Sequence, residues 1–298
     1  MQTKNKRMVK VLSASALALG LISAATMAQA AAGIANTRHN LGTANRTSGG
    51  VTFTTGSQGA RDGDLHTTGT DEICVFCHTP HGSAVPGVVN APLWNKGAPA
   101  TSNYTVYTSG TMQGTAGVAA GSMSLACLSC HDGTQAMDNM INSPGASGYV
   151  VGGARGGNAV NGVAVTGDWV AGTASAEGAD VVSGAMQSTA GVVMLGTDLS
   201  NDHPIGMAYC GGGQTNTASN AGCNDGDFNA QTGVAVNGGS FYVGSSGVQR
   251  ENMRTYGNST ATATVECGSC HDPHNAVNKT FLRTNNANSG VCLTCHVK

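Results

Sequence analysis

Aromatic and charged residues are scarce in this chain. Only 4% of its 298 residues are aromatic and only 10% are charged. Thirteen aromatic side chains are few for a core of this size, because aromatics bury the most area per residue. Either much of the chain is loosely built, or something other than side chains fills its interior. The formal net charge of −2, with no basic patch, excludes nucleic-acid binding driven by charge.

The first thirty residues have the pattern of a secretory signal peptide. Four cations between residues 4 and 10 precede an uncharged Ala/Leu/Ser-rich stretch, which ends in the small-residue triplet Ala28-Gln29-Ala30. We expect cleavage near Ala30–Ala31, with no membrane span left afterwards. An N-terminal membrane anchor is the alternative interpretation of the apolar run. Without these four cations the chain has 10 basic and 16 acidic residues, a formal charge of −6. The pattern predicts export to the cell surface or the extracellular space, with the periplasm as the alternative.

Eight of the ten cysteines lie in four copies of the pattern C-x-x-C-H. The copies are Cys74, Cys77 and His78; Cys127, Cys130 and His131; Cys267, Cys270 and His271; and Cys292, Cys295 and His296. In an exported chain this pattern is typical of covalently attached haem c. The two thiols form thioethers with the porphyrin, and the histidine is the proximal iron ligand. Zinc is the competing interpretation of paired cysteines. Four copies, each followed by histidine, favour four haems.

Cys210 and Cys223 belong to no such pattern. In an oxidising compartment we expect them to form a disulfide. Closing a loop of this size contributes about 3 kcal/mol in the chain-entropy model. A pair of free reactive thiols is the alternative.

The other histidines reveal an internal repeat. Each half of the chain has H-x-[Leu/Ile]-Gly, C-x-x-C-H-x-Pro-His and Cys-Leu-[Ser/Thr]-C-H, in that order. Two haems with two axial imidazoles each need four histidines, the number that each repeat supplies. We therefore predict four bis-histidine haems, whose distal ligands are His39, His81, His203 and His274. His66 has no counterpart in the second half and is expected to be a surface residue.

His81 and His274 each follow a proximal histidine by three residues. The proline between them restricts the linking backbone, which helps to hold the second imidazole in place. Such a histidine is badly placed to bind across the same porphyrin. We expect each to ligate an adjacent haem, which brings two haems close together.

Outside the motifs only short helical or extended stretches are plausible. Val51–Thr55 and Phe241–Val243 are candidate strands. We predict mostly coil, with short helices at the haem motifs, a few short strands and a core made of haem. The expected units are a signal peptide (1–30), a first two-haem repeat (31–135), a Gly/Ala/Val-rich haem-free insert (136–197) and a second two-haem repeat (198–298).

Several runs resemble the multihaem c-type cytochromes of metal-reducing bacteria. They are His39-Asn-Leu-Gly42, Ile73 to Gly82, Ala91-Pro-Leu-Trp-Asn95, Cys127 to Gly133, Leu199 to Ile205 and Cys270 to His274. With four haems, the chain is similar to the OmcE-type cytochromes, whose subunits polymerise into extracellular filaments. The resemblance covers about 31–135 and 198–298. It implies a homopolymer in which one distal histidine binds a haem of the neighbouring subunit. His39 is the candidate, because it lies close to the expected cleavage site and is weakly tethered.

Electron transfer is the expected function, and the protein is not expected to be an enzyme. A haem held by two imidazoles has no open position for a substrate, and it lacks the thioether ligand that raises the reduction potential. Other redox proteins or extracellular electron acceptors are the expected partners. A soluble periplasmic carrier is one alternative. A multihaem reductase is another, and it would need a five-coordinate haem.

Overall fold

The computed structural model describes the parts of the chain that surround the haem motifs. The described residues are 33–35, 37–42, 46–48, 51–53, 66–67, 72–80, 93–97, 99–119, 122–135, 140–142, 169–170, 181–182, 185–186, 194–214, 222–231, 240–244, 252–275 and 277–297. The expected signal peptide, His81 and most of the expected insert lie outside them. No helix in these ranges is long and apolar enough to cross a membrane.

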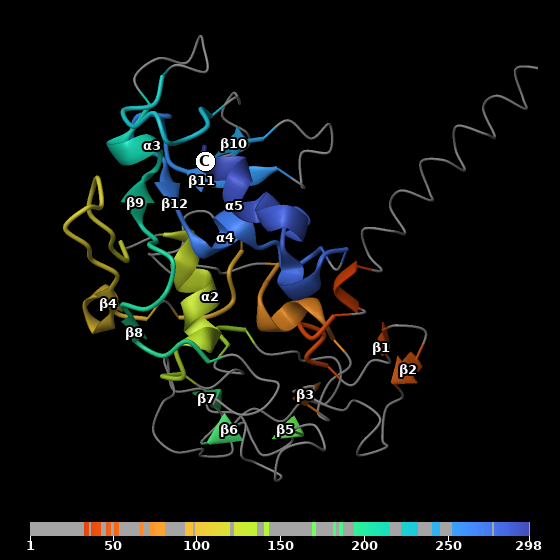
Figure 1. Cartoon of the computed structure of the whole chain (residues 1–298). Coiled ribbons are helices and arrows are strands. Elements are labelled where there is room, and N and C mark those ends of the chain that lie inside the picture. Colours follow the sequence, from red (N-terminus) through yellow and green to blue (C-terminus); the bar gives the residue numbers. More distant parts are fainter. Residues whose placement is uncertain are drawn as a thin grey trace, which may run out of the picture.

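The helices are short, and four of them hold the C-x-x-C-H motifs (Figure 1). The motif helices are η1 (Cys74–Phe76), α2 (Met123–His131), α4 (Cys267–Cys270) and α5 (Gly290–Cys295). The others are η2 (Thr101–Asn103), α3 (Tyr209–Gly212), η5 (Lys279–Phe281) and η6 (Ala287–Ser289). The expectation of short helices at the haem motifs is confirmed.

The strands are equally short, and most form isolated pairs. They are β1 (Arg46–Ser48), β2 (Val51–Phe53), β3 (His66–Thr67), β4 (Thr105–Val106), β5 (Trp169–Val170), β6 (Val181–Val182), β7 (Ala185–Met186), β8 (Asp198–Leu199), β9 (Met207–Ala208), β10 (Ser240–Val243), β11 (Met253–Tyr256) and β12 (Thr264–Val265). The strands expected at Val51–Thr55 and Phe241–Val243 are present as β2 and β10.

One four-stranded antiparallel sheet, in the order β10-β11-β12-β9, belongs to the second half of the chain. It packs beside α4 (Figure 1). Strands β4 and β8 pair in parallel, with Thr105 opposite Asp198. This pairing joins residues of the two expected repeats directly.

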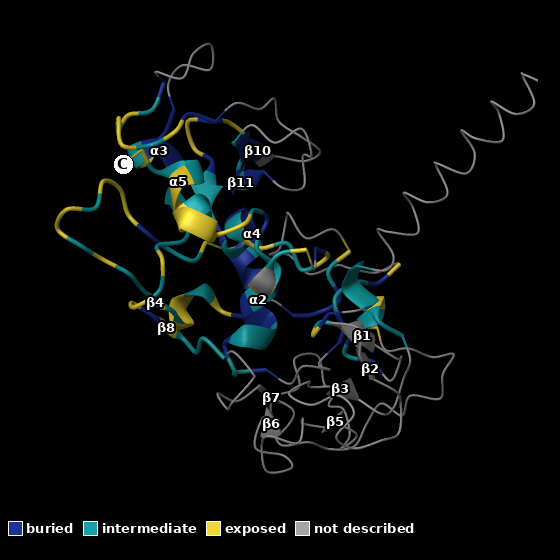
Figure 2. Ribbon diagram, turned by 45° about the vertical axis from the view of Figure 1, so that its right-hand side comes forward, coloured by how far each residue is buried: buried dark blue, intermediate teal, exposed yellow. Residues whose placement is uncertain are grey.

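The apolar core of the described residues is divided into three small clusters. Phe76 packs with Met140, and Leu125 packs with Ala126 on α2. The third cluster, around Tyr209 and Val243, lies against the sheet. Figure 2 shows buried residues along α2 and the sheet, whereas α5 carries exposed ones. Each cluster is small and adjoins a haem motif.

Candidate haem-binding site

Each C-x-x-C-H motif forms one helical turn. The backbone N–H of the motif histidine donates to the carbonyl of the first cysteine, at 2.8 Å for His78, 3.1 Å for His271 and 2.8 Å for His296. In α2 the helix itself continues through His131. Residues three apart in such a turn lie on one face, so both cysteines of a motif face the same way. This is the arrangement that a double thioether attachment needs.

Asn95 fastens the first motif. Its backbone N–H donates to the carbonyl of Cys77 at 2.9 Å, and its side-chain amide donates to the carbonyls of Val75 at 2.7 Å and Asn142 at 2.8 Å. Asn95 is fully buried. Its own sequence neighbourhood predicts no role for it. The one sequence feature that could have pointed to Asn95 is its position at the end of the run Ala91-Pro-Leu-Trp-Asn95.

Ser124 and Glu266 connect the second motif to the third by hydrogen bonds. The Ser124 hydroxyl donates to the buried Glu266 carboxylate and accepts the backbone N–H of Cys267 at 3.1 Å. Glu266 also begins α4 through a capping box with Ser269. Burial raises the pKa of Glu266, and the hydrogen bonds from Ser124 and Thr264 oppose that shift. The two halves of the chain therefore meet between two cysteine motifs.

The thiols place consecutive motifs side by side. The neighbouring pairs are Cys77 with Cys130, Cys127 with Cys267, and Cys270 with Cys295. In chain order, each motif thus adjoins the next. The four attachment sites follow one another through the molecule.

Burial raises the pKa of three of these thiols, whereas a hydrogen bond with Cys127 lowers the pKa of Cys267. Burial, with a smaller contribution from nearby cysteines, raises the pKa of Cys77 to about 12, of Cys270 to about 11 and of Cys295 to about 12. Reactive cysteines and metal-bound thiolates need the opposite shift. Among the described residues, no three His, Cys, Asp or Glu side chains gather where they could hold a metal ion.

Two pairs of imidazoles face each other across gaps of nearly equal width. The ring centroids of His39 and His131 are 6.2 Å apart, and those of His78 and His274 are 6.0 Å apart. A metal–imidazole bond is about 2 Å long, so two imidazoles on opposite sides of one metal have centroids about 6 Å apart. Both centroid separations are close to that value, with ring planes 84° apart in the first pair and 18° apart in the second.

His39 is held firmly inside the chain. Its ring stacks on Phe281 with centroids 4.4 Å apart, and its Nδ1 is buried without a hydrogen-bond partner. Burial and the adjacent His131 and His274 lower the pKa of His39 to about 4, so its ring is neutral, as a ligand must be. The sequence predicts a weak tether for His39; in the structure the Phe281 ring, from near the other end of the sequence, packs against it.

Two residues with left-handed backbone shape this region. Thr280 has φ of 54° and Phe281 has φ of 60°. Non-glycine residues rarely adopt this conformation, which is found most often at functional sites. Here it accompanies two contacts, the Thr280 carbonyl on Nδ1 of His271 at 2.7 Å and the Phe281 ring on His39.

Three histidines have a polar partner on Nδ1, so their Nε2 atoms are available to bind a metal. The Nδ1–H of His271 donates to the Thr280 carbonyl, and that of His203 donates to the Pro204 carbonyl at 3.0 Å. His274 directs Nδ1 to the Asp272 carboxylate at 3.3 Å. Metal-bound histidines usually carry such a partner on the other ring nitrogen, because it fixes the tautomer and the ring orientation. These histidines fit haem iron ligation.

His203 differs from the other candidate distal ligands that the structure describes. None of the described imidazoles lies against it, although in its exposure it resembles His274. Gly206, the glycine of the same H-x-Ile-Gly run, has φ of +66°, and a Cβ there would lie 1.5 Å from the carbonyl oxygen of Gly117. The glycine lets this loop pass close to the first half of the chain.

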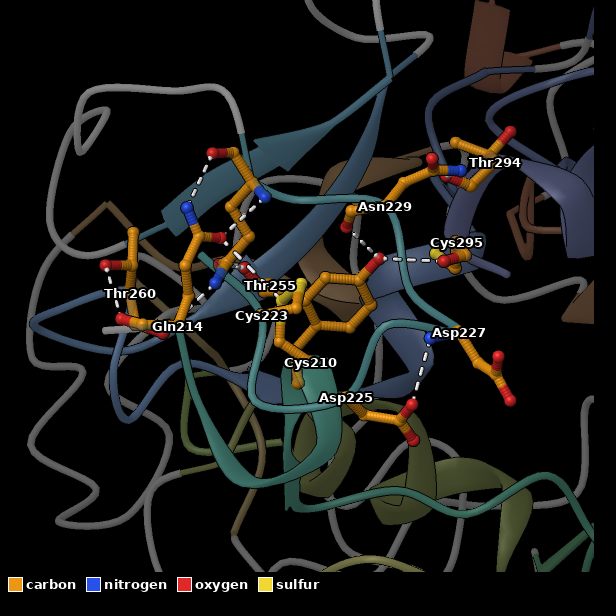
Figure 3. Close-up of a disulfide and its surroundings, with 12 residues drawn as sticks. Cys210, Gln214, Cys223, Asp225, Asp227, Asn229, Thr255, Thr260, Thr294 and Cys295 are labelled. Atoms are coloured by element: carbon orange, nitrogen blue, oxygen red, sulfur yellow. Dashed lines mark hydrogen bonds between the residues drawn. A yellow bond between two sulfur atoms is a disulfide. The ribbon is translucent and has the colours of Figure 1, made fainter. Parts of the chain in front are cut away.

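A disulfide and a tyrosine support the fourth motif (Figure 3). Cys210 and Cys223 are bonded, as the sequence analysis predicted. The adjacent Tyr209 hydroxyl donates to the carbonyls of Asn229 at 2.7 Å and Cys295 at 3.1 Å. Asn229 in turn donates its side-chain amide to the carbonyl of Thr294 at 3.1 Å. The residues on either side of the disulfide loop, Tyr209 and Asn229, thus hold the C-terminal motif in place.

Removing this disulfide is expected to destabilise the protein. In a Cys210→Ser/Cys223→Ser variant, the free energy of unfolding should fall by about 3 kcal/mol, because the unfolded chain regains the freedom of the open loop. Denaturant unfolding measures the change. A thiol reductant should bring the wild-type protein to the variant's value and leave the variant unaffected. An unchanged free energy of unfolding would contradict the role given to this loop.

The comparisons with known proteins agree with this geometry. A family model described as the doubled CXXCH motif matches residues 260–298, which hold the third and fourth motifs. No curated protein matches the chain. The doubled motif indicates covalently bound haem c and a c-type cytochrome of the multihaem class.

Proposed function

We propose that this protein is a tetrahaem cytochrome that carries electrons along a row of bis-histidine haems. The adjacency of all four motifs in chain order is the observation that carries the proposal. Haem c bound at each motif would supply an iron that takes up and releases one electron. The protein holds these groups close together and fills both axial positions, which leaves no room for a substrate.

The two facing pairs give the proposed ligand sets of the first two haems. His78 and His274 would hold the haem attached at Cys74 and Cys77, since their separation matches two bonds to one iron. His131 and His39 would hold the haem of the second motif on the same ground. The repeat then assigns the equivalent pairs, His271 with His81 and His296 with His203.

The pair of His296 and His203 leads to the filament proposal. His203 is exposed and lies against none of the described imidazoles. Leu293, inside the fourth motif, and Val297, directly after it, are 45% and 49% exposed. We propose that His203 of the partner subunit completes the ligand set of His296. Repetition of this contact would build a homopolymer outside the cell that delivers electrons to extracellular acceptors or other redox proteins. His203 thereby replaces His39 as the histidine shared between subunits.

Three measurements on the wild-type protein test the carrier. Mass spectrometry should find four covalently attached haems, and the resting ferric spectrum should be entirely low-spin. A redox titration should then reduce all four reversibly. Fewer haems would contradict the tetrahaem proposal. A high-spin haem in the resting assembled protein that binds cyanide would instead support a reductase.

Electron microscopy of the secreted protein tests the polymer. Uniform unbranched filaments support it, and discrete particles contradict it. A His203→Ala variant should retain four haems but form no filaments and show one high-spin haem. His66→Ala is the matched control, because His66 has no counterpart in the repeat, and its filaments should be normal. Normal filaments from His203→Ala would overturn the assignment of the shared ligand.

A further inference from the structure

The two H-x-Pro-His runs of the repeat differ at their second position. The first run has Thr79 after the motif histidine, and the second has Asp272. Thr79 is buried, and its hydroxyl accepts the side-chain amide of Asn142 at 2.9 Å, so it presents a neutral group. Asp272 presents a carboxylate in the same place. Two sites that the repeat makes equivalent thus differ in local charge.

The carboxylate of Asp272 is aimed at His274. Its Oδ1 lies 3.3 Å from the ring Nδ1 and also accepts the backbone N–H of His274 at 3.1 Å. The backbone N–H of Asp272 donates to the Phe281 carbonyl at 2.8 Å. Both the backbone and the side chain of Asp272 are therefore held in place beside the imidazole.

A buried cation holds the other carboxylate oxygen. Arg283 is only 3% exposed; its Nη1 lies 3.5 Å from Oδ2 of Asp272, and its Nε donates to the Gly268 carbonyl at 2.8 Å. The Tyr256 hydroxyl donates to the same carbonyl at 3.0 Å. Arg283 is thus anchored on the third motif and keeps Asp272 oriented. The carboxylate side chain is itself only 14% exposed, whereas the His274 side chain is 56% exposed, so solvent reaches the pair from the side of the imidazole.

A carboxylate on Nδ1 changes what the imidazole does as a ligand. It accepts the Nδ1 proton, leaves Nε2 to face the metal, and makes the ring a stronger electron donor. A stronger donor with a nearby negative charge stabilises the more positively charged, oxidised iron. Backbone carbonyls, the Nδ1 partners of His271 and His203, carry no net charge and do this less strongly.

We infer that Asp272 is a positioning residue that strengthens His274 as a ligand and lowers the reduction potential of the haem attached at Cys74 and Cys77. The inference rests on the proposed function, because it takes His274 and His78 as the axial ligands of that haem. A residue of the second repeat thereby sets the reduction potential of a haem attached to the first repeat. Loss of an outer hydrogen-bond partner of a metal-bound histidine typically changes metal affinity or activity by a factor of ten or more.

The test is a spectroelectrochemical titration of Asp272→Asn. Asparagine keeps an oxygen that accepts the Nδ1 proton but removes the charge, so one of the four haem transitions should rise in potential. We expect a roughly tenfold change in its oxidised-to-reduced equilibrium, which is 59 mV for one electron. The electron paramagnetic resonance spectrum should show one altered low-spin haem and no high-spin haem. Asp272→Glu, which restores the carboxylate, should return the transition toward the wild-type potential.

The matched control is Asp198→Asn, which removes the same charge from an exposed side chain. It should leave all four transitions in place. If Asp272→Asn moves no transition more than Asp198→Asn does, or if the glutamate variant behaves like the asparagine variant, the inference is overturned. Haem content measured by mass separates this result from failed maturation. Failure of the proposed function would be seen already in the wild-type protein, as missing haems or irreversible titration.

Discussion

Replacing His274 with alanine is expected to turn one haem of the four from low-spin to high-spin. The affected haem should be the one attached at Cys74 and Cys77, because the His274 ring faces His78 with centroids 6.0 Å apart. Removing the ring leaves that iron with one protein ligand and an open position. Ferric electron paramagnetic resonance and cyanide binding measure the change, and each should report one haem in four. The remaining transitions should keep their wild-type potentials.

A second substitution identifies which haem has lost its ligand. In a Cys74→Ala/Cys77→Ala background the first haem cannot be attached, so adding His274→Ala should produce no further high-spin signal. In a Cys267→Ala/Cys270→Ala background the first haem is present, and the same addition should produce the full signal. The reverse pattern would show that His274 serves the third motif. That outcome would contradict the proposed pairing and, with it, the role given to Asp272.

Arg283→Met is expected to give the largest loss of stability of the variants considered. The guanidinium is buried between the Asp272 carboxylate and the Gly268 carbonyl. Removing one partner of a buried ion pair leaves the other charge poorly compensated, which costs about 3–5 kcal/mol. Denaturant unfolding of the haem-loaded protein should show a fall of this size in the free energy of unfolding.

A double variant separates the ion pair from loss of packing. Asp272→Asn added to Arg283→Met removes the charge that the single variant strands. The double variant should therefore lose less free energy of unfolding than the sum of the losses in the two single variants. If the losses simply add, Arg283 does not stabilise the protein through Asp272. The ion pair would then have no part in orienting Asp272.

The local structure of the motifs was predictable because its causes are local. A C-x-x-C-H run forms one helical turn through its own residues. The backbone N–H of the histidine closes that turn on the carbonyl of the first cysteine. The bond between Cys210 and Cys223 followed from their being the only cysteines outside the motifs. The strands β2 and β10 followed from short β-branched and aromatic runs.

Residues that act across long stretches of sequence were not predictable in the same way. Asn95 reaches Asn142, and Ser124 reaches Glu266 and Cys267, and nothing in their own neighbourhoods marks these partners. The position of His39 near the start of the chain pointed to a loose tether, yet Phe281 holds it. A count of histidines could give the number of ligands but not which imidazoles meet, because that depends on how the two halves pack.

Because His274 faces His78, the two repeats of one chain would together supply both ligands of the first haem. This affects whether that haem keeps both ligands when the protein is dilute. On the proposed pairing, a chain with only the first repeat would have to borrow an imidazole from a second molecule, and the set would come apart as the protein became scarce. Because the two repeats belong to one chain, His274 meets the first haem within the same molecule. The local concentration of His274 at that haem therefore does not depend on the protein concentration. The first haem would then stay fully ligated in a single isolated subunit.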